Sequence, residues 1–192
     1  MTRSPLPAAL AAATLAAMLA ASAARAAPPS FTADTATSRL EFTGVQAGAE
    51  FKGSFHKFDA TVDFAPDALT ASRFDVHIDL DSVDTKDKDR DKTLRGPDIF
   101  DVAHFPAAHY VTRGFTKTAT GYTATGSLTL HGVTKDVPLD FQFVQKGAAA
   151  KLEGTALLKR LEFGVGQGDW KSTEWVADKV KVAFSLDLKQ RP

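Results

Sequence analysis

The chain has 192 residues, with 23 cationic and 23 anionic side chains and no cysteine. This even balance excludes the overall basic field with which nucleic-acid-binding proteins attract their ligand. The lack of cysteine excludes structural disulfides, thiolate nucleophiles and cysteine-ligated metal centres, so stability must come from an ordinary packed core.

The first 26 residues are typical of a secretory signal. Arg3 precedes a long alanine and leucine run, and Ala24-Arg25-Ala26 has the small-x-small pattern of a signal-peptidase site. A membrane anchor is the alternative, but a run made mostly of alanine is a weak spanning helix. We therefore predict a signal peptide at residues 1–26 and an exported domain at residues 27–192. Export leaves 21 cations against 23 anions, because the removed segment holds two arginines.

After Pro29, apolar and polar residues alternate with a period of two, which predicts antiparallel strands with one buried face and one wet face. The parity of the apolar residues switches between Phe55 and Phe58, which predicts a bulge or bend at His56-Lys57. The predicted strands, in chain order, are residues 39–46, 50–64, 72–82, 107–116, 121–131, 137–143, 150–160 and 180–188.

A charged segment separates the third and fourth predicted strands. Residues 84–95 are mostly charged, and Gly96-Pro97 forms a strong helix stop. We predict one short helix here and a second turn at residues 98–101. No linker, repeat or low-complexity segment follows the signal, which favours a single domain.

About eight antiparallel strands close either as a two-sheet sandwich or as a barrel. An eight-stranded barrel is just wide enough to be filled by side chains or to hold one slender ligand. The chain has 14 phenylalanines, most of them on the apolar side of their strands beside small residues such as Gly53 and Ala124. Such residues suit a solid core and an open lumen equally, so the composition leaves both interpretations open.

The sequence lacks the common motifs of metal binding and catalysis. No serine lies on a Gly-x-Ser-x-Gly elbow, and the glycine-rich segment 164–168 lacks the spacing of a dinucleotide site. The histidines form neither a His-x-x-x-His pair nor a zinc motif, so we predict no metal site. These histidines are His56, His77, His104, His109 and His131.

Five segments in order carry a more specific signal. They are residues 51–55 (FKGSF), 81–85 (DSVDT), 98–101 with 105–108 (DIFD and FPAA), 126–135 (GSLTLHGVTK) and 159–165 (KRLEFGV). Together they resemble the YceI-like family of lipocalin-like, polyisoprenoid-binding proteins, and the resemblance spans about residues 31–189. One departure is Gln46-Ala47-Gly48, which stands where many relatives have a histidine soon after the first strand.

The resemblance implies an all-β fold: an eight-stranded antiparallel lipocalin-like barrel, with the short helical insertion between the third and fourth strands. It also implies a periplasmic location and a long-chain isoprenoid lipid, such as an isoprenoid quinone or its precursor, threaded through an apolar lumen. We expect neither another cofactor nor nucleic-acid binding nor catalysis. We do expect transient contact with a membrane, and the protein to be a monomer or a homodimer. The alternatives are a solid-cored interaction module of the stress response and an enzyme of isoprenoid quinone processing.

Burial of one five-carbon isoprene unit is worth about 4 kcal/mol, so several units outweigh an association cost of about 4–15 kcal/mol. A polar head group would need donors at the mouth of the barrel, for which we select Arg95 and Arg160. The side chains predicted to line the lumen are Phe42, Phe51, Phe55, Phe74, Val76, Ile78, Phe100, Tyr110, Leu128, Leu130, Phe141, Phe143 and Phe184.

Overall fold

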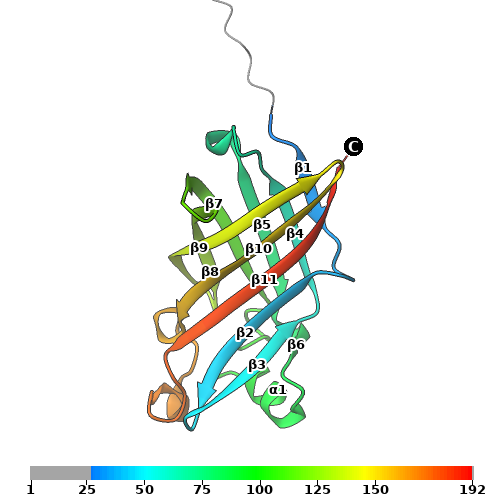
Figure 1. Cartoon of the computed structure of the whole chain (residues 1–192). Coiled ribbons are helices and arrows are strands. Elements are labelled where there is room, and N and C mark those ends of the chain that lie inside the picture. The colour runs from blue at the N-terminus through cyan, green and yellow to red at the C-terminus, as the bar shows by residue number, and fades with distance from the viewer. Residues whose placement is uncertain (1–26, 192) are drawn as a thin grey trace, which may run out of the picture.

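The computed structural model describes residues 27–191, and its strands form one continuous antiparallel sheet. The predicted signal peptide lies outside the described residues. The sheet closes because β1 pairs with β4 on one side and with the end of β11 on the other. The predicted eight-stranded antiparallel barrel is therefore confirmed (Figure 1). Its strands, in spatial order, are β1 (Ser30–Ala33), β4 (Phe58–Asp63), β5 (Arg73–Asp79), β7 (Ala107–Lys117), β8 (Tyr122–Leu130), β9 (Val133–Lys146), β10 (Ala149–Lys159) and β11 (Lys179–Gln190).

Three further strands extend one end of the barrel wall. β2 (Arg39–Gln46) pairs with β11 next to β1, β3 (Ala49–Phe55) pairs with β2, and the short β6 (Val83–Asp84) pairs with β3. The long strand predicted at 50–64 is thus β3 and β4, and it breaks at His56 and Lys57, where the parity switch placed the bend. β1 was not predicted, because its four residues are too few for an alternating pattern to show.

The strand predicted at 72–82 ends three residues early. The chain leaves β5 after Asp79 and forms a 3₁₀ turn, η2 (Leu80–Ser82). The Asp79 carboxylate accepts a hydrogen bond from the Asp81 backbone N–H at 3.0 Å, and the Ser82 hydroxyl donates to the Asp79 carbonyl at 2.6 Å. These local bonds offer the backbone an alternative to the sheet ladder, which is why the strand stops despite its apolar parity.

The predicted helix is present as α1 (Lys88–Arg95). Asp87 caps its N-terminus, because its carboxylate accepts from the backbone N–H groups of Asp89 and Arg90 at 3.1 Å each. Figure 1 shows α1 at the same end of the barrel as the β2–β3 turn and the loops between β10 and β11. Two more 3₁₀ turns lie in those loops, η3 (Arg160–Phe163) and η4 (Gly168–Lys171). None of the described helices has the length and apolar character needed to cross a bilayer.

Aromatic rings fill the opposite end of the barrel. Phe64, which follows β4, has no exposed surface and lies at the centre of this aromatic plug. The rings that surround it have centroids 4.9–5.8 Å from its own and belong to Phe74, Phe115, Tyr122, Phe141 and Phe143. Edge-to-face contacts at these distances add to the gain from burial. This half of the barrel is therefore solid.

Two ion pairs of β11, one at the seam where the sheet closes and one across to β10, predict a dependence of stability on pH. Asp34 contacts Lys189 at 2.6 Å, and Asp187 contacts Lys151 at 3.0 Å. Hydrogen bonds from these lysines lower the pKa of both carboxyl groups below their ordinary value. A lowered pKa means that the folded state binds the proton less readily than the unfolded state. Each carboxylate therefore stabilises the folded state above its unfolded-state pKa, and this stabilisation is lost as the pH falls through the folded-state pKa.

We expect the free energy of unfolding to fall as the pH drops below about 4, and part of this fall to disappear in Asp34→Asn. Urea unfolding of both proteins between pH 3 and pH 7 measures the difference. Lys189→Gln, which removes the partner of Asp34, should flatten the profile in the same way. Identical profiles for all three proteins would show that the seam does not contribute to acid sensitivity.

Candidate functional site: an apolar cavity at the α1 end

An apolar cavity of about 220 Å³ lies between the aromatic plug and the α1 end. Strand alternation builds its wall: Ala156 of β10 lines the cavity, whereas the next residue, Leu157, has 59% of its surface exposed on the outside. Eleven of the thirteen side chains predicted for the lumen do line it: Phe42, Phe51, Phe55, Phe74, Val76, Ile78, Phe100, Tyr110, Leu128, Leu130 and Phe184.

The other two predicted residues lie elsewhere. Phe141 and Phe143 face the interior of the barrel but belong to the plug, with Phe141 5.1 Å from Phe74 and Phe143 5.7 Å from Phe31 between ring centroids. Parity along a strand tells which face a side chain takes. It does not tell the height of that residue along the barrel axis, which depends on strand tilt and register.

Several lining residues were missed by the sequence analysis. Val182 has the same inward parity as the predicted Phe184 on β11, and Leu152 lies on the apolar parity of β10 between two less buried residues, so the pattern could have found both. Leu94 of α1, Phe163 of η3 and Val176 come from helical or irregular segments, where a period of two carries no information. These segments line the cavity because they fold over the end of the barrel.

Phenylalanine rings surround the part of the cavity next to α1. Phe55 lies between Phe42 and Phe100, with ring centroids 5.5 Å and 6.0 Å away. The guanidinium of Arg90 on α1 stacks over Phe51 at 4.6 Å from its ring centroid. Gly53 of β3 leaves room for this arrangement, because a Cβ at that position would overlap the ring of Phe42. Phe51 and Phe55 are partly exposed whereas Phe42 and Phe100 are buried, so we place the mouth of the lumen at Phe51 and Phe55.

Arg160 brings a charge to this apolar site. It lines the cavity, has only 6% of its surface exposed, and donates to the backbone carbonyls of Val165, Val176 and Ala177 at 3.0, 2.8 and 3.1 Å. Gly166 permits this position, since a Cβ there would overlap Nη1 of Arg160. Burial lowers the pKa of the guanidinium, which nonetheless stays charged because its ordinary pKa is so high.

Tyr110 is the other polar side chain among the described residues that line the cavity. Its hydroxyl donates to the Val137 carbonyl at 3.0 Å, and burial raises the pKa of the phenol above its usual range. The hydroxyl is therefore neutral and already engaged. It stabilises the wall and offers no charge to a ligand.

Arg95, the second arginine selected for the head group, points away from the cavity. Its Nε and Nη2 donate to the carbonyls of Asp81 and Val83 at 2.8 and 2.7 Å, and Nε also lies 3.1 Å from the Asp81 carboxylate. These bonds tie the end of α1 to η2 and β6. The structure thus places one of the two predicted arginines at the lumen and gives the other a structural position.

Comparison with known proteins agrees with this architecture. A YceI-like domain model matches residues 31–188. A UPF0312 protein of Yersinia enterocolitica is 35% identical over 130 residues, which cover 61% of this chain and 68% of that protein.

Solved structures of related proteins also resemble this chain. The crystal structure of BcnA from Burkholderia cenocepacia is 34% identical, with a TM-score of 0.76 over 81% of this chain and 98% of BcnA. A polyisoprenoid binding domain from Saccharophagus degradans, implicated in plant cell wall breakdown, is 18% identical, with a TM-score of 0.66 over 84% of this chain and 98% of that domain, and shares the fold. On the family model and the relatives together, this chain belongs to the YceI-like family.

Proposed function

We propose that the protein binds a long-chain isoprenoid lipid, such as an isoprenoid quinone or its precursor, and carries or stores it in the periplasm. The observation that carries this proposal is the apolar cavity of about 220 Å³ with the buried guanidinium of Arg160 in its wall. The shared fold with a polyisoprenoid binding domain supports it. The mechanism is the removal of an apolar chain from water.

The size of the cavity limits how much of the lipid it holds. An apolar cavity of about 150 Å³ is known to bind benzene, so about 220 Å³ accommodates on the order of two isoprene units. At about 4 kcal/mol for each unit, their burial contributes about 8 kcal/mol before the cost of association. In our proposal, further units lie among the rings of Phe51, Phe55 and Phe100 at the mouth.

In our proposal, the positions of the plug and of Arg160 set the orientation of the ligand. The cavity ends at Phe74, whose ring belongs to the plug, so the lipid enters one end and does not thread through the whole barrel. The tail then points toward Phe74 and the head toward Arg160. A guanidinium has five N–H donors, of which three contact carbonyls here, and the remaining donors suit a pyrophosphate or a quinone oxygen.

We further propose that the protein acts without catalysis. Among the described lining residues, Arg160 and Tyr110 carry the polar side-chain groups. Together they do not form the pair of nucleophile and general base that covalent catalysis uses. The open half of the barrel favours a carrier over the solid-cored interaction module.

A chain-length series tests the proposal. Geraniol, farnesol and geranylgeraniol should bind with rising affinity until the cavity and its mouth are filled, because each added unit buries more apolar surface. Farnesyl pyrophosphate should bind about tenfold more tightly than farnesol, which reflects its charge-assisted hydrogen bonds to Arg160. Titration calorimetry measures both effects. Affinity that does not depend on chain length would contradict the proposal.

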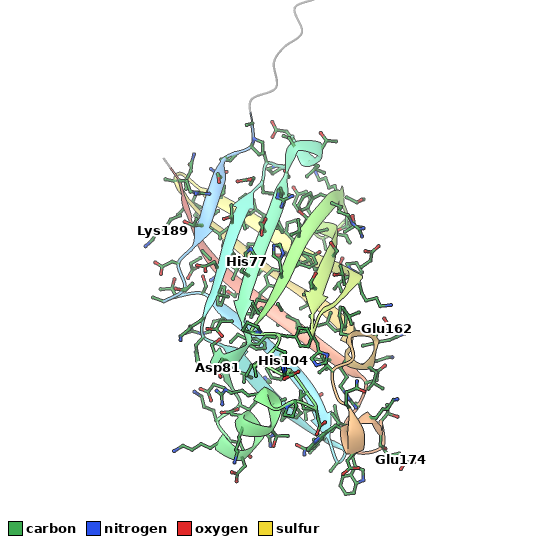
Figure 2. All side chains as sticks on the ribbon, turned by 180° about the vertical axis from the view of Figure 1, so that it is seen from behind. His77, Asp81, His104, Glu162, Glu174 and Lys189 are labelled. Carbon is green, nitrogen blue, oxygen red and sulfur yellow. The ribbon has the colours of Figure 1, made fainter. Side chains whose placement is uncertain are left out.

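Transient membrane contact, the route by which the lipid would enter, has a candidate residue. Trp175 is 66% exposed at the α1 end, and its carbonyl accepts from the Ala47 N–H at 2.7 Å, which fixes it beside the β2–β3 turn. Its neighbour Glu174 marks this end of the molecule in Figure 2. Tryptophan suits the interface between lipid and water, because its ring is apolar and its N–H can stay hydrated.

Trp175→Ser is therefore expected to slow the uptake of an isoprenoid from vesicles several-fold, while its affinity for the same lipid in detergent stays unchanged. Leu157→Ser is the matched control, since Leu157 is similarly exposed but lies on the barrel wall. Uptake followed by fluorescence dequenching distinguishes the two variants. Equal rates for Trp175→Ser and the unaltered protein would exclude this contact.

A further inference from the structure

Two histidines stand side by side on the outer wall of the barrel. His77 of β5 pairs directly with His109 of β7, and their rings stack at 3.9 Å between centroids with an angle of 12° between the planes. Figure 2 shows His77 partway along the wall, far from the labelled Glu174 at the mouth end. The two side chains are 59% and 38% exposed, so a dissolved ion can reach both.

Asp75 completes a group of three ligands. It lies two residues before His77 on β5, and one of its carboxylate oxygens, Oδ1, is 2.7 Å from Nε2 of His109 and 3.3 Å from Nε2 of His77. The candidate ligand atoms of the three residues all lie within 4.8 Å of one another. The other oxygen, Oδ2, is held at 2.8 Å by Arg73, which fixes the orientation of the carboxylate.

We propose that Asp75, His77 and His109 bind one divalent transition-metal ion of the zinc type. Two imidazole nitrogens and one carboxylate oxygen form a ligand set that zinc uses when a fourth position stays open to water or to another molecule. The Nε2 atoms already converge on one oxygen, so short side-chain movements suffice to place a cation among the three groups. The paired strands β5 and β7 hold the backbone of all three residues in place, so metal binding has to order only their side chains.

The arrangement also explains why no metal-binding motif is visible in the sequence. Zinc motifs are recognised by ligands that are close in the chain, whereas His77 and His109 become neighbours through the register of β5 and β7. The positive charge of Arg73 opposes a cation, but its hydrogen bond is to Oδ2, so Oδ1, which now contacts the two imidazoles, is the oxygen that would bind the metal. The expectation of no metal site was based on motif spacing and on the position of each histidine in its own segment, neither of which shows the pairing between β5 and β7.

This site is separate from the lipid cavity. Val76 and Ile78 flank His77 in the chain and line the cavity, so His77 and Asp75 take the opposite face of β5. Metal binding can therefore be tested without disturbing the lumen, and failure of one proposal leaves the other intact.

The experiment is a titration of the full chain, prepared without a histidine tag, with ZnCl₂ in a calorimeter. We expect one equivalent of Zn²⁺ to bind. Co²⁺ at the same site should show the visible absorption of a four-coordinate ion. His77→Ala and His109→Ala should each weaken binding at least about tenfold, and Asp75→Asn should weaken it in the same direction.

His104→Ala is the matched control. His104 is also exposed and lies 2.9 Å from a carboxylate, that of Asp101, but this pair lacks the second imidazole of the proposed site. Its loss should leave Zn²⁺ affinity unchanged, and circular dichroism should show that all variants fold. Three results would overturn the proposal: no stoichiometric binding, unaltered affinity in His77→Ala and His109→Ala, or an equal loss in His104→Ala.

Discussion

Replacement of Phe64 with alanine is expected to lower the free energy of unfolding by about 3–5 kcal/mol. Phe64 is completely buried at the centre of the aromatic plug, with five rings around it. Its removal loses both the transfer free energy of the ring and the contacts of the rings that face the new void, which a closed barrel cannot collapse to fill. Urea unfolding of the purified variant measures the change.

Phe51→Ala is the informative comparison. Phe51 is half-buried at the mouth, so its loss should cost much less stability than the loss of Phe64 but should weaken isoprenoid binding. Phe64→Ala, if it remains folded at low temperature, should instead accept longer chains, because the plug that ends the lumen has been opened. Equal destabilisation by the two variants would contradict the distinction between a tightly packed plug and a partly exposed mouth.

Arg160→Leu has the second largest expected effect, a loss of about 3 kcal/mol in the free energy of unfolding. Three carbonyls lose their hydrogen-bond donor at once, and each buried unsatisfied group costs about 1–3 kcal/mol. The expected total is near the lower end because water at the mouth can donate to some of these carbonyls. The preference for farnesyl pyrophosphate over farnesol should also disappear. Unfolding curves and parallel titrations with the two ligands give both quantities.

Two further variants separate the structural role of Arg160 from a role in ligand binding. Arg95→Leu also removes donors from two carbonyls, but away from the cavity, so it should lower stability without changing the preference for the pyrophosphate. Gly166→Ala forces the guanidinium out of its position and should reproduce the loss of preference while the arginine is still present. If Arg95→Leu and Arg160→Leu change ligand preference alike, Arg160 does not contact the head group.

Strand alternation made most of the barrel predictable. An inward side chain every second residue placed β5, β7, β8, β9, β10 and β11 to within a few residues, and the parity switch located the bend between β3 and β4. The features that alternation could not predict depend on local hydrogen bonds or on the length of a strand. The carboxylate of Asp79 ends β5 early, and β1 is too short to show a period.

The candidate site was predictable in part for the same reason. Parity found the inward face, so Phe74, Ile78 and Leu128 line the cavity, whereas the height of Phe141 along the barrel puts it in the plug. The pairing of His77 with His109 is a matter of register between strands. Residues 80–106 rather than a tight turn connect β5 to β7, so no loop length in the sequence gives the register of this pair.

The most direct test of the account compares the lipid content of three natively purified proteins by mass spectrometry of their organic extracts. Ala156→Trp places an indole in the cavity, and Leu157→Trp places the same ring on the outer wall one residue later. We predict a stoichiometric long-chain isoprenoid in the unaltered protein and in Leu157→Trp, and little or none in Ala156→Trp. Repeated absence of lipid from the unaltered protein, or equal amounts in both tryptophan variants, would contradict a ligand-binding lumen.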